Sequence, residues 1–266
     1  MKLNPPNFID PAAATALQHA SHVVVFTGAG VSSESGIPTF RDALTGLWER
    51  FDAASLATPA AYRKDKDLVW GWYEWRRMQV LRALPNPAHI AIAALAQFVP
   101  KLTVVTQNVD DLHERAGSTN VVHLHGSLHT PRCFACGRPH HLDQEIPREP
   151  EGGRRLRPPN CDHCGGSIRP GVVWFGESLP TQELNSAFTA AKQCDVMLVV
   201  GTSGLVQPAA GLPARAKNAG ASLIQINPVK TDLDGECTWT LYGQAGTLLP
   251  KLLNMAFPNM DLTRVA

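Results

Sequence analysis

The stretch HVVVFTGAGVS, residues 22–32, joins a short apolar run directly to a glycine-rich turn. Residues 23–26 predict a buried β-strand, because an unbroken apolar run of this length is typical of a strand covered on both faces. Gly28 and Gly30 follow at once and predict a tight turn whose backbone can approach a phosphate closely. The turn is only a partial GxGxxG pattern, since Ser33 occupies the third glycine position. By itself it is as compatible with a plain structural turn as with a nucleotide site.

The continuation of this stretch, SGIPTFR at residues 35–41, favours the nucleotide site. It adds an aromatic side chain, Phe40, and a permanent cation, Arg41, close to the glycine turn. A cation beside a phosphate-binding turn fits a dinucleotide better than it fits an ordinary loop.

Further apolar segments that end in polar residues occur at residues 102–105, 120–126, 196–200 and 221–227. Patterns typical of helices lie between the expected strands, for example at residues 87–99 and 184–194. Apolar strands that alternate with helices predict an α/β fold with a parallel sheet covered on both faces.

Polar residues gather where the expected strands end. These ends are Thr27-Gly28, Thr106-Gln107-Asn108, His125-Gly126, Gly201-Thr202-Ser203 and Asn227. In an open parallel sheet, ligands bind at the carboxyl ends of the strands. Packing alone hardly accounts for five such ends, so we expect a ligand site along this edge.

Residues 129–170 interrupt the alternation, because they are rich in Pro, Gly, Cys and Arg and show little apolar periodicity. They contain two CxxC pairs, Cys133 with Cys136 and Cys161 with Cys164. Thiolates at this spacing predict a tetrahedral four-cysteine zinc site. Four protein ligands leave no open position, so the zinc is expected to be structural. The sequence thus predicts a small inserted module that depends on metal for its order.

Two histidines, His123 and His125, are expected on one face of the strand that precedes this module. His123 lies within the apolar run, where a core histidine is the commoner outcome. His125 is the last residue before Gly126, at the expected ligand edge. A neutral imidazole there can accept a proton near pH 7.

The composition indicates a globular protein with a substantial core. The chain has 266 residues, of which 44% are hydrophobic and 18% charged, and its net charge is +1. This balance gives no general attraction to nucleic acid or membrane, and the basic run at residues 148–157 is expected to be a solvated loop. No apolar stretch is long enough to span a membrane, and the first 20 residues match neither a secretory nor a transit signal. We therefore expect a cytoplasmic protein, with no membrane and no specific nucleic-acid partner.

Taken together, the motifs resemble the sirtuins, the NAD-dependent protein lysine deacylases. In chain order they are GAGVSSESGIPTFR at 28–41, TQNVDDLH at 106–113, HLHG at 123–126, the two CxxC pairs, VVWFGE at 172–177, GTS at 201–203 and IN at 226–227. The likeness covers residues 23–245, which is most of the chain. It implies a Rossmann-type, doubly wound domain at residues 1–128 and 171–266 with a small zinc-ribbon module at residues 129–170. An acyl-lysine protein or peptide would bind between the two.

The resemblance also implies roles for individual residues. His125 would act as general base, with Asn108 as a second catalytic residue, while the acyl group passes from lysine to ADP-ribose and nicotinamide is released. Residues expected to bind NAD are Gly28, Ala29, Gly30, Phe40, Arg41, Trp48, Gln107, Asn108, Asp110, Gly201, Thr202, Ser203, Asn227 and Ala245. Residues expected to bind the substrate backbone by strand addition are Val173, Trp174, Phe175, Gly176 and Glu177.

A helix is expected over VWGWYEWRRMQV, residues 69–80, with Tyr73 and Arg76 on the same face. On spacing alone, Arg76 is equally well explained as a side chain that lays its stem on the aromatics and keeps its head in water. The Tyr-x-x-Arg pattern, however, resembles that of the class III sirtuins, in which the pair contacts a carboxylate on the acyl chain. The resemblance therefore implies a preference for succinyl-, malonyl- or glutaryl-lysine over acetyl-lysine.

Two other functions use the same residues, namely mono-ADP-ribosyl transfer to protein and non-catalytic NAD sensing. The second would require a damaged catalytic set, whereas His125, Asn108 and Asp110 are all present. An ordinary dehydrogenase is disfavoured, because the Gln-Asn-Val-Asp turn serves in the sirtuins to remove nicotinamide. Two positions depart from the family pattern, since Gly171 and Gly204 stand where relatives often carry a larger residue.

Overall fold

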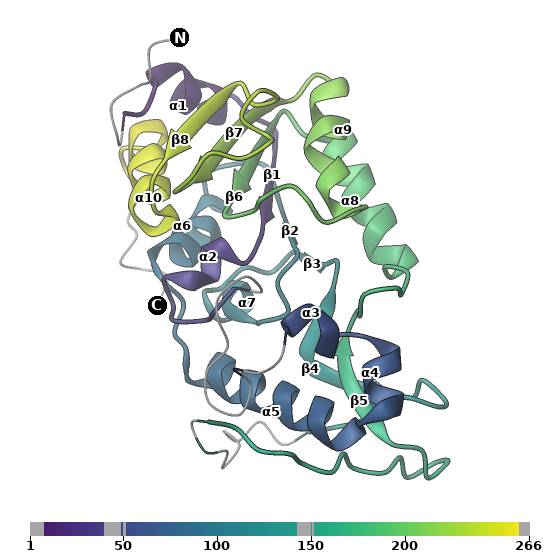
Figure 1. Ribbon diagram of the computed structural model, residues 1–266. Coiled ribbons are helices and arrows are strands. Elements are labelled where there is room, and N and C mark those ends of the chain that lie inside the picture. The colour runs from purple at the N-terminus through teal and green to yellow at the C-terminus, as the bar shows by residue number, and fades with distance from the viewer. Residues whose placement is uncertain (1–7, 40–48, 50–51, 143–149, 151, 261–266) are drawn as a thin grey trace.

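The computed structural model describes residues 8–39, 49, 52–142, 150 and 152–260. Within them the chain forms a six-stranded parallel sheet and a two-stranded antiparallel sheet (Figure 1). The strands of the large sheet, in spatial order, are β3 (Val121–His123), β2 (Lys101–Thr106), β1 (His22–Thr27), β6 (Val196–Val200), β7 (Ser222–Asn227) and β8 (Trp239–Tyr242). This order is the one typical of doubly wound dinucleotide-binding folds, so the predicted fold class is confirmed.

Helices cover both faces of the large sheet, as the unbroken apolar strands require. Every residue of β1 and of β6 is buried, and a strand buried on both faces must have a layer on each side. The helices on one face are α1 (Pro11–Gln18), α6 (Pro87–Leu95) and α10 (Ala245–Ala256), and those on the other are α8 (Thr181–Gln193) and α9 (Leu212–Asn218) (Figure 1). The remaining short helices of this part are α2 (Gly30–Ser33), α7 (Leu112–Arg115) and η2 (Ala209–Gly211).

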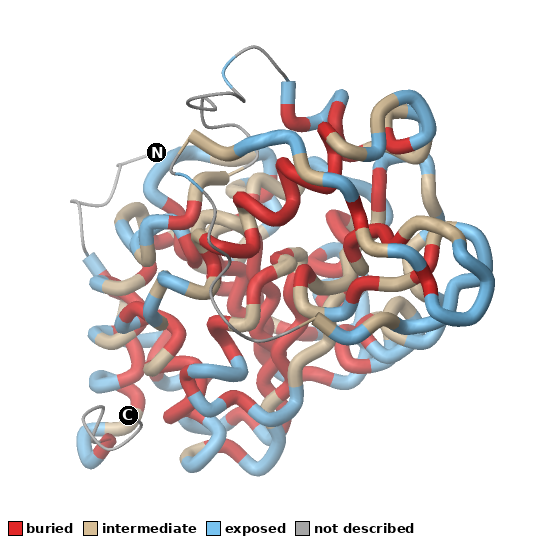
Figure 2. The backbone as a smooth tube through the Cα atoms, turned by 90° about the horizontal axis from the view of Figure 1, so that it is seen from below, coloured by how far each residue is buried: buried red, intermediate tan, exposed pale blue. Residues whose placement is uncertain are grey.

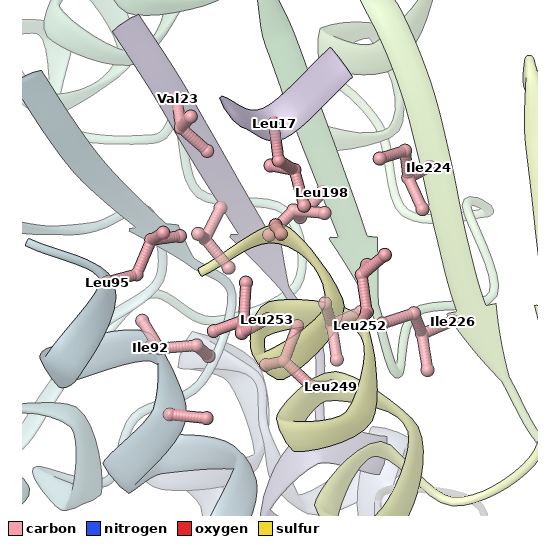
Figure 3. Close-up of a cluster of buried hydrophobic side chains, with 14 of the residues drawn as sticks. Leu17, Val23, Ile92, Leu95, Leu198, Ile224, Ile226, Leu249, Leu252 and Leu253 are labelled. Carbon is pink, nitrogen blue, oxygen red and sulfur yellow. The ribbon is translucent and has the colours of Figure 1, made fainter. Parts of the chain in front are cut away.

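The largest core lies between the sheet and the helices α1, α6 and α10. In Figure 3, Leu17, Ile92 and Leu252 point from the helices toward the strands that carry Val23 and Ile224. All five side chains have no exposed surface. Figure 2 shows the described residues by burial, with the buried ones gathered in the interior and the exposed ones at the rim. Among the described helices, none combines the length and the apolar character that crossing a membrane requires.

A smaller lobe is built on the antiparallel pair β4 (Gly126–Cys133) and β5 (Ile168–Val172). The helices that pack around this pair are α3 (Ala53–Leu56), α4 (Pro59–Lys64) and α5 (Lys66–Arg82) (Figure 1). Leu56 and Trp72 from these helices share one buried cluster with Leu128 of β4 and Val172 of β5. The sequence pattern did not associate α3–α5 with the cysteine segment, and the proposed domain boundaries at residues 128 and 170 stay a prediction.

The segment around His125 differs from the expectation. β3 ends at His123, and His125 lies in the turn between β3 and β4 rather than on a strand. Gly126 follows with a φ of 73°, a left-handed conformation that glycine adopts without strain. A Cβ atom on Gly126 would lie 2.2 Å from the Gly171 carbonyl oxygen, and one on Gly171 would lie 1.9 Å from the Thr130 carbonyl oxygen. The departure at Gly171 therefore has a physical reason, since the backbones of β4 and β5 leave no room for a side chain.

The described part of the basic run packs against α5 instead of standing free in solvent. Leu156 donates a backbone hydrogen bond to the Asp67 carbonyl oxygen at 2.9 Å. A Cβ atom on Gly71 would lie 2.0 Å from the Arg154 carbonyl oxygen, which explains a glycine inside α5. Arg155 pairs with Asp65 at 2.6 Å. Residues 152–157 thus belong to the small lobe, although the side chains of Arg154, Arg155 and Arg157 are exposed.

Candidate active site

The carboxyl ends of four neighbouring strands meet through direct contacts. Gln107, after β2, donates from Nε2 to the Thr202 hydroxyl at 2.8 Å, and Asn227, at the end of β7, donates from Nδ2 to the Thr202 carbonyl at 3.2 Å. Gly28, after β1, donates its backbone N–H to the Val200 carbonyl of β6 at 3.0 Å. The polar residues expected along this edge are therefore neighbours in space, at the point where the strand order reverses direction.

The glycine turn after β1 packs against the loop that follows β6. A Cβ atom on Gly28 would lie 2.8 Å from the Gly201 carbonyl oxygen, and a Cβ atom on Gly30 would lie equally close to it. Both glycines are therefore required by the close approach of two backbones. Gly204, the second departure from the family pattern, has a φ of +68° and would direct a Cβ atom to within 2.7 Å of the Leu233 side chain. The contact of the turn with a phosphate stays a prediction.

His125 is held by one ring nitrogen. Its Nδ1 lies 2.9 Å from the Gln107 carbonyl oxygen. A carbonyl oxygen only accepts, so Nδ1 carries the hydrogen and Nε2 of the neutral ring keeps its lone pair. Burial lowers the pKa of His125, against the weaker opposing effect of the Gln107 carbonyl. The imidazole is therefore neutral near pH 7 and has one nitrogen ready to accept a proton.

A buried chain of polar groups connects Asn108 to Asp110. Asn108 donates from Nδ2 to the Ser32 hydroxyl at 3.0 Å, and that hydroxyl donates to Asp110 Oδ2 at 3.0 Å. Burial raises the pKa of Asp110, although hydrogen bonds from Leu112 and Ser32 oppose it. The sequence analysis did not select Ser32, and its place two residues after Gly30 was the only available signal.

Two further histidines, His89 and His113, are buried next to this chain. His113 ends the TQNVDDLH motif, but the sequence pattern assigned a role to neither histidine. Nε2 of His113 lies 3.0 Å from the hydroxyl of Thr27, which donates to the hydroxyl of Thr106 at 2.8 Å. The Thr106 hydroxyl in turn accepts the backbone N–H of Asn108 at 3.0 Å. Burial lowers the pKa of His89 to about 4 and holds that of His113 well below its usual value. Both rings are thus neutral. His113 supports the turn that carries Gln107 and Asn108 through Thr27 and Thr106, and His89 packs against His113 with ring centroids 4.9 Å apart.

Tyr73 and Arg76 lie three residues apart on α5, as expected. Tyr73 is 3% exposed, and burial raises the pKa of its hydroxyl to about 12. Burial also lowers the pKa of Arg76, while the nearby Tyr73 and Asp110 act in the opposite direction. The adjacent Arg77 is paired with Glu74 at 2.8 Å. Arg76 therefore lies near both the predicted acyl contact and the polar chain described above.

Residues 172–177, predicted to bind substrate, are fixed from both sides. The Val173 N–H donates to the His125 carbonyl at 2.8 Å, and the Phe175 N–H donates to the Ala57 carbonyl at 2.9 Å. Phe175 is 49% exposed, whereas Trp174 is only 1% exposed. The Glu177 carboxylate accepts from Arg169 and from the Trp174 N–H, both at 2.9 Å. The Trp174 side chain is therefore too deeply buried for a substrate to touch it directly.

The four cysteines converge on one point. Their Sγ atoms all lie within 4.8 Å of one another, with Cys133 and Cys164 at 3.5 Å and Cys136 and Cys161 at 3.8 Å. A tetrahedral zinc–thiolate site has sulfur atoms about 3.8 Å apart, so the donor set fits zinc. The Cys136 N–H points at Cys133 Sγ and lowers the pKa of that thiol to about 6. The protein therefore carries a closed site for one structural zinc.

The remaining predicted site residues lie partly outside the described part of the chain. Phe40, Arg41 and Trp48 belong to the residues that the structure does not describe. Ala245 begins α10 and is buried, and the next residue, Gly246, donates its backbone N–H to Glu34 Oε1 at 2.9 Å. Ala245 is thereby tied to the segment that follows the glycine turn.

Comparisons with known proteins agree with this geometry. The sequence model of the Sir2 family matches residues 28–208. A protein of Methylococcus capsulatus named NAD-dependent protein deacylase is 60% identical over 237 residues, which cover 89% of this chain and 93% of the relative. The crystal structure of a Sir2 homologue in complex with NAD superposes with a TM-score of 0.87 at 42% identity, covering 97% of this chain and 98% of the other. A Sir2 complex with a deacetylated p53 peptide and 3′-O-acetyl-ADP-ribose has a TM-score of 0.79 at 29% identity and covers 91% and 96% of the two chains.

Proposed function

The chain belongs to the Sir2 family and is an NAD-dependent protein deacylase, and we propose that it removes succinyl, malonyl or glutaryl groups from lysine in preference to acetyl. The substrates are acyl-lysine residues of proteins, in keeping with the peptide complex of a related structure. The observation that carries the proposal is the placement of Tyr73 and Arg76 on α5, near Asp110 at the site.

The residues at the strand ends fit NAD. The glycine turn and the Gly201 loop lie together at the switch point of the sheet, where dinucleotides bind in this fold. Thr202 and Asn227 would hold the adenosine half, and Gln107, Asn108 and Asp110 the nicotinamide half. When bound, NAD would supply the ribose carbon that bonds to the acyl oxygen as nicotinamide leaves. The structural zinc takes no part in this chemistry, because its four thiolates leave no open position.

His125 is the general base in this proposal. The Nδ1–H of His125 already donates to the Gln107 carbonyl. A proton that His125 accepts during the reaction must therefore bind to Nε2. Burial keeps the ring neutral before the reaction, and the Gln107 carbonyl then stabilises the protonated ring through the same hydrogen bond. Asn108 is fixed by Ser32 and by its own backbone N–H to Thr106, which orients the turn beside the reacting groups.

The proposed acyl preference follows from the hydrogen-bond donors that Tyr73 and Arg76 present and from the positive charge of Arg76. A guanidinium and a phenol hydroxyl both donate hydrogen bonds, and a carboxylate accepts from both. Each hydrogen bond to a charged partner contributes roughly 1.5–3 kcal/mol. An acetyl group carries no carboxylate and would gain neither contact, so it is the poorer substrate.

The double substitution Tyr73→Phe with Arg76→Met tests this proposal. It removes both donors while it keeps the apolar volume, so desuccinylation should fall at least ~100-fold by the energy scale above. Deacetylation should be unchanged or faster. Steady-state rates on matched succinyl- and acetyl-lysine peptides measure both. An equal loss of the two activities would make the pair structural and the enzyme a general deacetylase.

A further inference from the structure

The indole of Trp174 makes a hydrogen bond that the function described above does not use. Its Nε1–H donates to the Tyr73 hydroxyl oxygen, with 3.0 Å between nitrogen and oxygen. We propose that Trp174 is a positioning residue for the acyl chain. Its indole N–H fixes the direction of the Tyr73 hydroxyl proton, and this direction selects which acyl chains bind well. This inference rests on the proposed acyl preference and explains how a side chain that no substrate can touch contributes to it.

The direction of the proton follows from the chemistry of the two groups. An indole N–H only donates, whereas a phenol hydroxyl both donates and accepts. Because Tyr73 accepts from Trp174, its own proton must point away from the indole. Within the described residues, Trp174 is the only hydrogen-bond partner of the Tyr73 hydroxyl. The described part of the chain thus offers this proton no acceptor, and it is available to an acceptor on the acyl chain.

The indole is itself held rigidly. Trp174 is 1% exposed, and the Arg169 guanidinium lies 3.4 Å from the centroid of its ring. Tyr62 and Phe134 pack against the same ring, with centroids 5.3 and 6.2 Å away. Its backbone N–H is bound by Glu177, which Arg169 also holds. Rotation of the indole would break several of these contacts, so the position of Nε1 is fixed before any substrate arrives.

A fixed hydroxyl donor next to a guanidinium selects for a group that has acceptors only. A carboxylate at the end of the acyl chain satisfies this requirement with both oxygens. A primary amide of the same length presents one acceptor and an NH₂ group, and the NH₂ meets a proton instead of a lone pair. Without Trp174, the Tyr73 hydroxyl could rotate and accept from that NH₂. Trp174 thus separates a carboxylate from its uncharged isostere.

The substitution Trp174→Phe tests the inference, because it keeps an aromatic ring and removes only the N–H donor and part of the ring volume. We expect the ratio of kcat/KM for succinyl-lysine over acetyl-lysine peptide to fall about tenfold, the scale of one hydrogen bond to a charged group. The loss should lie mainly in the KM for the succinyl peptide and should exceed any loss of kcat/KM for the acetyl peptide, because only the succinyl chain carries the carboxylate. In a protein that already carries Tyr73→Phe, adding Trp174→Phe should cause no further change in this ratio.

Tyr62→Phe is the matched control, because it removes a buried hydroxyl from the same aromatic cluster. That hydroxyl donates to the Ile168 carbonyl and does not contact Tyr73, so its loss should lower stability without changing the ratio. If Trp174→Phe lowers both activities equally, or changes the ratio no more than Tyr62→Phe does, the indole is structural and the inference is overturned.

A second measurement uses only the wild-type enzyme, so it tests the inference even if the Trp174→Phe protein fails to fold. The wild-type enzyme should prefer a succinyl-lysine peptide to its terminal-amide analogue by at least about tenfold. Equal rates on these two peptides would overturn the inference while leaving a preference over acetyl intact. A wild type without any preference for succinyl over acetyl would instead remove the proposed acyl specificity, and the inference with it.

Discussion

Among single residues, the imidazole of His125 matters most for the proposed deacylation. His125 donates from Nδ1 to the Gln107 carbonyl, and its peptide carbonyl accepts the N–H of Val173 in the segment proposed to bind substrate. A base fixed in this way needs no rearrangement before it accepts a proton. Its removal should therefore affect turnover far more than binding.

We predict that His125→Ala lowers kcat at least ~100-fold, the scale of a lost general base. NAD should still raise the melting temperature of the variant as it does in the wild type, because a ligand that binds the folded state stabilises it. Steady-state kinetics and thermal melts with and without NAD measure both effects. Near-normal turnover in a folded His125→Ala protein would contradict the assignment.

The pH profile provides a second test of the same residue. Burial lowers the pKa of His125 below its ordinary value of 6.5, so the neutral, proton-accepting form persists to more acidic pH than for a free histidine. The acidic limb of kcat/KM, which reports on the free enzyme, should have its midpoint below pH 6.5. A midpoint above that value would mean that a different group, or a charged environment, controls the limb.

Which residues carry the chemistry was partly visible in the sequence. His125, Asn108 and Tyr73 stand in short motifs, because each follows a strand or shares a helix face with a partner. Ser32 and His113 also stand in the quoted motifs, but the pattern gave neither a role of its own, since their roles come from contacts between β1, β2 and the short helices α2 and α7. Such contacts join residues about 80 positions apart, and no local pattern indicates them.

At the scale of elements, apolar runs predicted the strands well, because a strand buried on both faces needs unbroken apolar residues. The same rule failed at HLHG, where the run passes into a turn. β3 ends at His123, and the left-handed Gly126 starts β4 in the small lobe. Periodicity cannot show that α5 joins this lobe, since its apolar residues surround the helix on most sides.

The antiparallel pair β4–β5 depends on the zinc site for its outer end. Cys133 closes β4, and its register partner Ile168 opens β5. We predict that Cys161→Ser lowers the zinc content, destabilises this lobe and reduces activity indirectly, because metal binding is coupled to folding. Metal analysis and thermal melts measure these changes. Cys194→Ser is the matched control, since that buried cysteine lies outside the cluster and should leave zinc content unchanged. An active wild-type protein without zinc would refute the assignment.

At the scale of the whole molecule, the site draws on both lobes. The residues proposed to bind NAD come from the carboxyl edge of the large sheet, whereas Tyr73, Trp174 and Phe175 come from the small lobe. His125 lies on the connection between the two. The motif order indicated the family, and the folded chain adds that His125 contacts Gln107 on one side and Val173 on the other.

The most direct test of the central claim is a competition in one tube. Equal amounts of succinyl- and acetyl-lysine peptide of the same sequence are incubated with the wild-type enzyme and NAD, and the products are followed by mass spectrometry. The account predicts that the succinyl peptide is consumed first, with one nicotinamide released and one succinyl-ADP-ribose formed for each lysine freed. Loss of acetyl at an equal or faster rate, or ADP-ribose attached to protein instead of transferred acyl groups, would contradict it.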